Sequence, residues 1–525
     1  IWAKEEVDVC IRQMSFKNSM PIKINGVLLE GDTVRLNAGW NSLLGRIRYL
    51  SHSQEFGISV DGPENLCFSA TGRKGGPKFA IIGPFDLNEE DRKNAAAFVD
   101  ESIVLAEPLV MEAAFEVSEA IWEDGDVAKL VGEPFFQVMK PEHVPEVDVF
   151  TRAYTDRVIP GEVVIENEDA LLSGNDWAVI NPVDGKDVRV LLDFGREIVG
   201  FHRFEIDAAA GTIVDFHNFE FIQPDGRYNF AEGMNNSFRY ICCDGWQEYE
   251  TIVRRGLRYS YMILRDFKHP IKIRRVEVAF STYPQSNKGY FACSDAKLDK
   301  IWEVGANTLR CCSEDTFTDC PTYEQVNWVG DARNEALIHW AINGDPRLWY
   351  RCLEQTGDSL ERSDITESNV PSGWRNILPA WTMLWMRSCR EYVLFTGDTA
   401  KGAILLDYVR RNVEGMRKYI NSDGLFDIHA WNLFDWAAMD TPSHGVVTHQ
   451  NCLAVHALRD VAEMADWLGK DQLAKDWRSF ARSLADAVNE HLWNEEKGAY
   501  TDCLHGKEQS AVFSQQTQTA AVMSG

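Results

Sequence analysis

The sequence predicts a multidomain protein with antiparallel β domains in its first half and an all-α domain in its second half. At 525 residues, the chain has room for about three or four domains. Before residue 285, apolar and polar residues alternate with period two between Asn-Gly and Asp-Gly corners. From residue 294 onward, apolar residues recur every three or four positions instead, which is the helical spacing.

Residues 1–118 are predicted to form a first β-sandwich domain. Its short alternating segments lie at 23–32, 33–41 and 57–61. The corners between them contain the glycine dipeptides that join antiparallel strands. Residues 89–98 carry a local helical pattern and are expected to form a short helix on this domain.

Residues 119–285 are predicted to form a second β-sandwich domain with a linker. The linker is placed at the polar, proline-containing stretch 140–148. Strands are expected at 188–195, 198–206, 212–217, 249–253, 259–264 and 273–280. Their near-regular spacing, with Ala-Gly and Pro-Asp-Gly corners, is typical of a sandwich.

Residues 286–525 are predicted to form the helical domain. A first helix is expected at 294–312, with Ser294 or Asp295 as its N-cap. Further helices are expected at 380–395, 400–420, 450–468 and 472–492, with no strands between them. Such a series indicates stacked helical hairpins, as a toroid or a solenoid, and the absence of a fixed sequence repeat favours the toroid.

Residues 319–331 contain three carboxylates and a tryptophan just before an amphipathic segment. If the chain is helical from 324 to 340, one helix face carries Glu324, Trp328, Asp331 and Glu335. Acids beside an indole form an unusual core face. The pattern instead favours the wall of a pocket for a polar molecule with an apolar side, such as a sugar.

Hydrolysis of a glycosidic bond needs one carboxylic acid to protonate the leaving oxygen and a second carboxylate to activate water or attack the sugar. Glu324 is the candidate acid, because desolvation and the neighbouring acids are expected to raise its pKa. Asp319 and Asp331 would bind hydroxyls or hold that proton in place. Taken singly, Asp319 could be a helix N-cap and Asp331 an exposed helix acid, without any role in a site. The number of acids in this short stretch favours a site.

Two further loops are candidates for sugar contacts. Residues 431–445 contain Trp431 and the pair Asp435-Trp436, in which a carboxylate could accept sugar hydroxyls while an indole stacks on the ring. A second loop, 371–376, carries Trp374. Loop aromatics often serve packing alone. His444 and His449 flank the end of the first loop and would either face a pocket or act as loop and cap residues.

Composition and motifs exclude several functions. A net charge of −27 disfavours nucleic acids and anionic membranes as partners. The twelve histidines are scattered without an HExxH motif, and dinucleotide, P-loop and GxSxG motifs are absent, so neither a metal nor a cofactor is expected. The twelve cysteines are interpreted mainly as buried free thiols, and no apolar run is long enough for a membrane span.

The stretch Asp-Cys-Pro-Thr-Tyr-Glu-Gln-Val-Asn-Trp-Val-Gly-Asp at 319–331 resembles the signature of the α-L-rhamnosidases of glycoside hydrolase family 78. Weaker similarities follow the family's order at 193–200, 210–212, 224–226, 291–295 and 435–436. The resemblance implies β-sandwich domains followed by an (α/α)6 barrel, and cleavage of terminal α-L-rhamnose with inversion. Glu324 then matches the general acid, while Asp319, Trp328 and Asp331 match residues of the sugar subsite.

Three features depart from the family pattern or lie outside it. Tyr323 and Gln325 stand where basic residues are common, so either an altered rhamnose subsite or one that accepts a different deoxy sugar is expected. The family's general base is a glutamate late in the barrel, and the helical part here is short for twelve helices, so the last helices and the base are expected beyond Gly525. Asp435 and Glu335 are disfavoured as substitutes for that base.

The alternatives to a rhamnosidase are a non-catalytic carbohydrate-binding protein and another (α/α)6 glycosidase or a lyase. A homodimer remains open. The chain starts at Ile1 without a signal segment, so its compartment cannot be read from this end. The resemblance to bacterial enzymes favours the periplasm or the cytoplasm.

Overall fold

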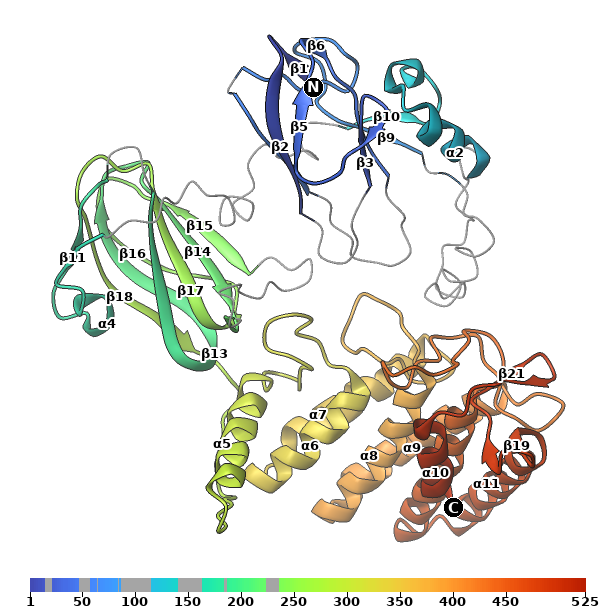
Figure 1. Ribbon diagram of the computed structural model, residues 1–525. Helices are drawn as coiled ribbons and strands as arrows, with labels where there is room; N and C mark the ends of the chain where they lie inside the picture. The colour runs from blue at the N-terminus through green and yellow to red at the C-terminus, as the bar shows by residue number, and fades with distance from the viewer. Residues whose placement is uncertain are drawn as a thin grey trace. The chain divides into compact units, whose positions relative to one another are not determined.

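The computed structural model describes residues 1–14, 21–46, 57–63, 65–83, 85, 115–139, 163–183, 187–222 and 236–525 (Figure 1). The predicted helix at 89–98, the linker at 140–148 and the Pro-Asp-Gly corner at 224–226 lie outside these residues. The chain divides into two compact units: the first comprises 1–98, 104–156 and 230–235, and the second comprises 99–103, 157–229 and 236–525. No helix in the described ranges is both long and apolar enough to cross a membrane.

The first unit contains two three-stranded antiparallel sheets. In one, β2 (Val7–Met14) lies between β5 (Thr33–Leu36) and β8 (Gly57–Asp61), and in the other β3 (Ile22–Ile24) lies between β4 (Val27–Leu28) and β7 (Leu43–Gly45). Asn25 and Gly26 both have positive φ, so the predicted Asn-Gly corner is a tight hairpin turn. Buried residues of both sheets, including Ile11 and Ile22, form one core.

Two further strand pairs belong to this unit: β1 (Trp2–Ala3) with β6 (Gly39–Trp40), and β9 (Ala80–Ile82) with β10 (Phe136–Val138). Helix α2 (Phe115–Asp124) is followed by the short helix η1 (Val127–Leu130). Lys23 Nζ donates to the Trp122 carbonyl at 2.8 Å, and Arg46 pairs with Glu119. The first unit therefore continues past residue 118, where the first domain was predicted to end.

The second unit begins with a sheet built around one long strand, β13 (Val188–Ala208), where two strands were predicted. Up to Gly200 this strand pairs with β17 (Arg255–Arg265), and from there it pairs with β16 (Gly245–Glu250) and β18 (Ile271–Phe280). The register shifts between Asp193 and Ile198. The rest of the sheet comprises β11 (Ile165–Glu166), β12 (Ala178–Ile180), β14 (Ile213–Phe219) and β15 (Ser237–Ile241), with the short helix α4 (Ala170–Ser173) beside it.

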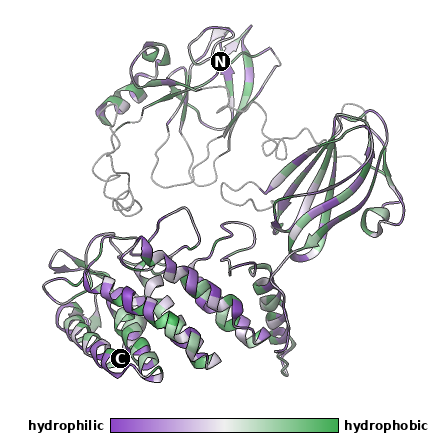
Figure 2. Ribbon diagram, turned by 180° about the vertical axis from the view of Figure 1, so that it is seen from behind, coloured by the Kyte–Doolittle hydropathy of each residue, from purple (hydrophilic) through white to green (hydrophobic). Residues whose placement is uncertain are grey.

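This sheet folds back on itself, which confirms the predicted sandwich. Phe204 of β13 and Phe216 of β14 have ring centroids 5.4 Å apart, although these two strands are not neighbours in the sheet. Their rings therefore meet, tilted by 33°, across a core between two layers. Both are fully buried, and hydrophobic and hydrophilic residues alternate along the strands (Figure 2).

The helical part contains α5 (Ala296–Cys311), α6 (Val329–Asn343), α7 (Arg347–Asp358), η3 (Ser359–Glu361), α8 (Pro379–Thr396), α9 (Thr399–Arg417), α10 (Thr448–Trp467), α11 (Asp471–Leu492) and α12 (Gln515–Ser524). Asp295 caps α5 as predicted, because its side chain accepts from the Lys297 amide at 2.9 Å. Contrary to the strand-free prediction, two small hairpins follow α11. They are β19 (Trp493–Asn494) with β20 (Ala499–Tyr500) and β21 (Leu504–His505) with β22 (Glu508–Gln509).

The helices form two rows (Figure 1). Alternate helices pack together in a first row, α6 on α8, α8 on α10 and α10 on α12, while α7, α9 and α11 form a second row. Arg387 pairs with Asp460, and Arg390 pairs with Glu463 three residues further along both helices, so α8 and α10 are parallel. This is the layout of an (α/α) barrel, as predicted. It places the starts of the first-row helices at one end.

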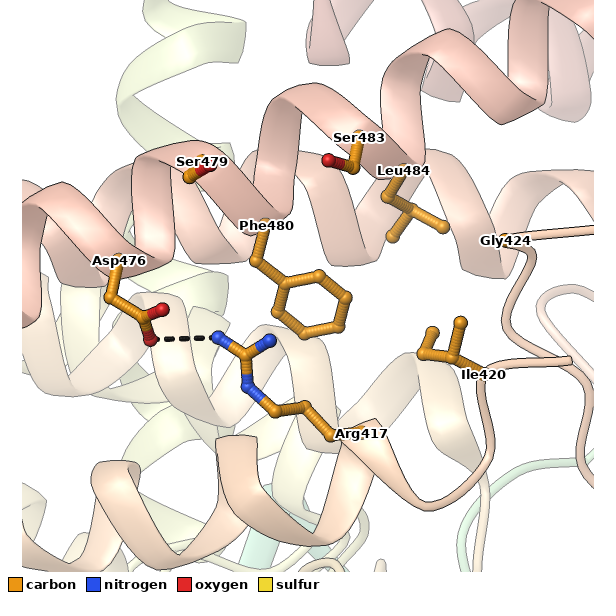
Figure 3. Close-up of a pocket in the computed structure, with 8 residues that line it drawn as sticks. All are labelled: Arg417, Ile420, Gly424, Asp476, Ser479, Phe480, Ser483 and Leu484. Carbon is orange, nitrogen blue, oxygen red and sulfur yellow. Dashed lines mark hydrogen bonds and ion pairs between the residues drawn. The ribbon is translucent and has the colours of Figure 1, made fainter. Parts of the chain in front are cut away.

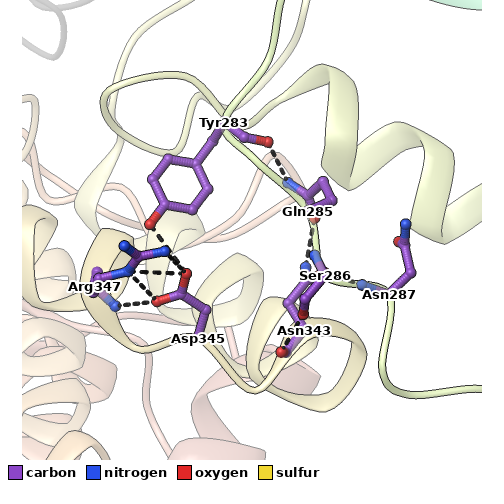
Figure 4. Close-up of polar contacts among 7 residues, drawn as sticks. All are labelled: Tyr283, Gln285, Ser286, Asn287, Asn343, Asp345 and Arg347. Atoms are coloured by element: carbon purple, nitrogen blue, oxygen red, sulfur yellow. Dashed lines mark hydrogen bonds and ion pairs between the residues drawn. The ribbon is translucent and has the colours of Figure 1, made fainter.

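Residues 283–287 join the sandwich to the helices and are pinned to the end of α6 (Figure 4). Asn343 Oδ1 accepts from the backbone amides of Ser286 at 3.1 Å and Asn287 at 3.0 Å. The Tyr283 hydroxyl donates to Asp345 Oδ2 at 3.2 Å. These bonds hold the connection between the two parts of this unit in one conformation.

Candidate functional site

All predicted site residues lie at the starts of the first-row helices or in the loops just before them. Residues 319–328, 371–376 and 431–447 precede α6, α8 and α10, respectively. Because these helices are parallel neighbours, the three loops share the same end of the barrel. Residues more than a hundred positions apart in the sequence therefore form one site.

Residues 319–328, here called the acid turn, are not helical, so the predicted helix from residue 324 starts five residues too early. The Asp319 amide donates to the Val326 carbonyl at 3.0 Å, and the Val326 amide donates to Asp319 Oδ1 at 3.2 Å. Gln325 adopts a left-handed conformation with φ of 54°. This closed turn leaves only Asp331 and Glu335 on a shared helix face.

The turn still brings Glu324 and Trp328 together, because the Trp328 indole Nε1 donates to Glu324 Oε2. Glu324 is exposed to solvent, whereas Asp319, Asp331 and Glu335 are half-buried. Desolvation was predicted for Glu324. In the structure its three neighbouring acids are the ones that are partly buried. Together these four acids are called the acid cluster.

Burial shifts Asp319, Asp331 and Glu335 toward their protonated forms. It raises the pKa of Asp319 to about 6 and raises the pKa of Asp331, and nearby carboxylates add to both effects. Trp381 Nε1 donates to Asp331 Oδ2 at 3.2 Å and opposes the shift there. Gly330 permits this contact, because a Cβ at position 330 would lie 2.7 Å from the Trp381 ring.

Glu335 was not predicted as a site residue, but its surroundings in the structure are unusual for a carboxylate. Burial, together with the charges of Asp331 and Asp319, raises its pKa well above the usual range. Its Oε2 atom is buried and has no hydrogen-bond partner among the described residues. A buried acceptor of this kind is costly, so it suggests a polar group that binds there.

The four tryptophans predicted to bind sugar form one tryptophan cluster. The Trp328 ring centroid lies 5.9 Å from that of Trp374 and 6.1 Å from that of Trp431. Trp374 and Trp431 are 6.1 Å apart, and Trp436 lies 6.2 Å from Trp431. Trp374 and Trp436 are 41% and 79% exposed, so indole surface remains open to a ligand.

The remaining predicted residues of the 431–445 loop differ in their surroundings. Asp435 is exposed and accepts from Gln516 Nε2 at 2.9 Å, a contact from α12 that the sequence did not indicate. His449 is fully buried in the first turn of α10 and stacks on Phe434 at 4.8 Å. The exposed His444 instead stacks on another loop histidine.

One acid of the sandwich also reaches the acid turn. Thr322 Oγ1 donates to Glu197 Oε1 at 3.5 Å, and Glu197 lies at the register shift of β13. Burial and the charge of Glu220 raise the pKa of Glu197 to about 8. Glu197 is far from the acid turn in the sequence, so no sequence pattern indicated this contact.

A separate groove lies between α9 and α11 (Figure 3). It encloses about 330 Å³, and neither the acid cluster nor the tryptophan cluster lines it. Arg417 pairs with Asp476 at 2.7 Å and covers the Phe480 ring, so the charges in the groove compensate each other. We assign this groove no role in the site.

Comparisons with known proteins match both parts of the second unit. Residues 286–524 match the bacterial alpha-L-rhamnosidase six-hairpin glycosidase domain, and residues 184–265 match the bacterial alpha-L-rhamnosidase concanavalin-like domain. A GH78 family rhamnosidase of Bacillus sp. GL1 is similar in structure, with a TM-score of 0.84 and 30% identity over 100% of this chain and 55% of that one.

Two more proteins are similar over parts of the chain. A Klebsiella oxytoca rhamnosidase shares the fold, with a TM-score of 0.54 and 20% identity over 69% of this chain and 74% of that one. An alpha-L-rhamnosidase of Formosa agariphila is 25% identical over 176 residues, which are 32% of this chain and 18% of that protein. The chain thus spans about half of the Bacillus protein and under a fifth of the Formosa protein.

Proposed function

Because the chain belongs to the bacterial α-L-rhamnosidase family, glycoside hydrolase family 78, we propose that it is part of an inverting enzyme that releases terminal α-L-rhamnose. Glu324 is the proposed general acid. The observation that carries this proposal is the contact between the Glu324 carboxyl and the Trp328 indole. It joins the acid cluster to the tryptophan cluster.

The site suits a deoxy sugar. Rhamnose has an apolar methyl and ring C–H surface that can stack on an indole, and hydroxyls that need acceptors. The tryptophan cluster offers the first, with Trp374 and Trp436 partly exposed. Asp319 and Asp331 offer carboxylate oxygens beside it, and the unpartnered Oε2 of Glu335 would gain a donor from a bound hydroxyl.

Glu324 is the acid best placed to reach a glycosidic oxygen, because it is exposed while its three neighbours are half-buried. In an inverting reaction it would protonate the leaving oxygen. A second carboxylate, about 6.5–9.5 Å across the sugar, would activate the attacking water. We assign no residue of this chain to that second role.

The two departures from the family pattern bear on specificity. Gln325 Nε2 donates to the Pro321 carbonyl at 2.7 Å, so its side chain folds back onto the acid turn. It supplies no cation to the sugar. Neutral residues at positions 323 and 325 therefore favour an altered rhamnose subsite, or one that accepts a different deoxy sugar.

The test is a panel of p-nitrophenyl glycosides assayed with the full-length protein, its Glu324→Gln variant and a Glu303→Gln control. Glu303 is an exposed acid on α5 that pairs with Lys300, outside the site. We expect faster release from the α-L-rhamnoside by the wild type and the control than by Glu324→Gln. Equal turnover by wild type and Glu324→Gln contradicts the role of Glu324. Proton NMR of the first product tests inversion, which predicts the β anomer.

A carbohydrate-binding protein without catalysis is the second candidate, and the tryptophan cluster alone would support it. Calorimetry that detects rhamnose binding, with no product from any glycoside, would favour it. Depolymerisation of uronic acid polymers would instead indicate a lyase. The acid cluster disfavours such anionic substrates, because like charges would meet in the site.

A further inference from the structure

The loops before α10 and α12 bring three metal-ligating side chains together outside the acid and tryptophan clusters. One ligand atom from each of Asp440, Cys503 and His505 lies within 4.8 Å of the other two. We propose that these three side chains bind one divalent transition-metal ion, with zinc as the ion that fits best. The sequence predicted no metal site, because only the fold brings Asp440 close to Cys503 and His505.

The spacing of the three atoms agrees with a zinc site. With bonds of about 2.0–2.3 Å, the ligand atoms of a tetrahedral zinc ion lie about 3.3–3.7 Å from one another. Cys503 Sγ lies 3.6 Å from His505 Nε2. Asp440 Oδ2 lies 2.7 Å from the same nitrogen, as a hydrogen bond, so this oxygen would move outward by less than about 1 Å to admit an ion.

The backbone already holds these side chains in place. Cys503 and His505 are two residues apart in extended chain at β21, so their side chains project from the same face. Val447, just before α10, forms a bridge with Cys503. The two loops are therefore joined without a metal, and the ligands are brought together before any ion binds.

Asp440 is oriented by groups behind it. Its backbone amide donates to Asp502 Oδ2 at 3.1 Å, and the buried Asp502 accepts from the Ser514 amide at 2.8 Å through its other oxygen. The Ser510 hydroxyl donates to Asp440 Oδ2. Such supporting hydrogen bonds are typical of the groups that orient metal ligands.

The donor set and the exposure favour zinc over a hard cation. A thiol, an imidazole and one carboxylate suit zinc, whereas calcium and magnesium prefer oxygen ligands alone. Cys503 is fully buried, while the His505 side chain is 56% exposed, so an ion can enter from the histidine side. Three protein ligands would leave a fourth position for water.

A bound ion would link the loop that carries Trp431 and Trp436 to the β21–β22 hairpin. Asp440 lies four residues after Trp436. The ion would thus fix one wall of the tryptophan cluster. This inference does not depend on the proposed hydrolase activity, because metal binding can be measured directly.

The test is titration of the metal-stripped, full-length protein with Co²⁺, followed by competition with Zn²⁺. We expect one equivalent of Co²⁺, a sulfur-to-cobalt charge-transfer band, and displacement of that band by Zn²⁺. Cys503→Ser should lose the band, and His505→Ala should weaken binding at least tenfold. Cys243→Ser is the matched control, because Cys243 is an exposed thiol in the sandwich.

A second measurement covers variants that fold poorly. Zn²⁺ should raise the Tm of the wild type and of Cys243→Ser, and Mg²⁺ should not. The near-isosteric Asp440→Asn should lose most of this rise. Absence of the charge-transfer band in the wild type, or the same Zn²⁺-dependent rise in Cys503→Ser and Asp440→Asn as in the wild type, overturns the proposal.

Discussion

Gly256 in strand β17 lies directly against Pro321 in the acid turn. A Cβ at position 256 would lie 2.4 Å from the Pro321 carbonyl oxygen and 2.7 Å from Thr322 Oγ1. The Gly256 carbonyl in turn accepts from Asn236 Nδ2 at 2.8 Å. The sandwich therefore packs against the turn that carries Glu324 and helps to hold that turn in position.

Replacement of Gly256 by alanine should displace the acid turn. We expect a loss of about 1–3 kcal/mol in the free energy of unfolding, because backbone atoms on both sides must shift. The loss of kcat in the proposed rhamnoside hydrolysis should be larger than this destabilisation alone explains. Urea unfolding and steady-state kinetics measure the two effects.

Gly305→Ala is the matched control for that variant. Gly305 is an exposed residue within α5, and a Cβ there meets nothing within 4 Å. Alanine at this position should stabilise the helix by about 0.5–1 kcal/mol without changing kcat. Equal kcat values for Gly256→Ala and the wild type would show that the turn does not depend on the sandwich.

Replacement of Glu335 by glutamine should stabilise the protein at high pH. The pKa of Glu335 is raised in the folded state, so the folded protein binds more protons than the unfolded chain above the unfolded pKa of about 4.3. Stability from this group is therefore lost as the pH rises from there. The glutamine side chain of the variant does not ionise, so the variant has no such loss.

The measurement is the Tm of wild type and Glu335→Gln at pH 4, 6 and 8. We expect the variant to be more stable by roughly 1–3 kcal/mol at pH 8, and the difference to shrink toward zero at pH 4. A wild type that is the more stable protein at pH 8 would mean that the Glu335 carboxylate has a favourable partner.

Removal of Trp431 should weaken sugar binding the most among the tryptophans, because its ring contacts Trp328, Trp374 and Trp436. Trp431→Ala should raise the Kd for rhamnose at least tenfold, which corresponds to about 1.4 kcal/mol. Calorimetry measures this change. Trp246→Ala is the control, because that indole is 60% exposed on the sandwich strand β16, and an equal effect of both variants would argue against a specific cluster.

His202 should make the sandwich sensitive to acid. Burial lowers its pKa to about 3, and its ring contacts Phe216 and Phe238 at 5.1 and 5.2 Å. Between about pH 6.5 and 3 the unfolded chain binds a proton here that the folded protein does not, so stability is lost as the pH falls through this window. The loss is at most about 1.4 kcal/mol per pH unit.

Urea unfolding at pH 7.5 and pH 5.0 measures this effect. His202→Phe should lose less stability between the two conditions than the wild type. The exposed His269 provides the control, since His269→Gln should follow the wild type. If His202→Phe keeps the full pH dependence, another group is responsible for it.

Sequence patterns predicted the elements whose structure is decided locally. The helices at 380–395 and 400–420 start within one residue of α8 and α9, because their apolar spacing and the turns before them act over a few residues. The acid turn escaped prediction because Asp319 closes it across seven residues onto Val326. The strand pair around Gly195 was predicted as two strands, because the register shift within β13 resembles a break.

The residues of the candidate site also divide into those that the sequence predicted and those that it did not. Glu324 and the four tryptophans stood out by residue type, and by resemblance in the case of 319–331. Trp381, Glu197 and Gly256 did not, because each acts through a contact with a segment at least 50 residues away. Such contacts depend on how the helices and the sandwich pack, and a single sequence has no local signal for them.

The role of Glu324 is tested most directly by how its loss depends on the leaving group. A general acid contributes about 10²–10⁴-fold, and it matters most when the leaving oxygen is basic. Kinetics of wild type and Glu324→Gln on aryl and alkyl α-L-rhamnosides measure this dependence. We predict a loss of kcat/KM that grows as the leaving group becomes more basic, whereas a loss of equal size for every leaving group would contradict the assignment of Glu324 as the general acid.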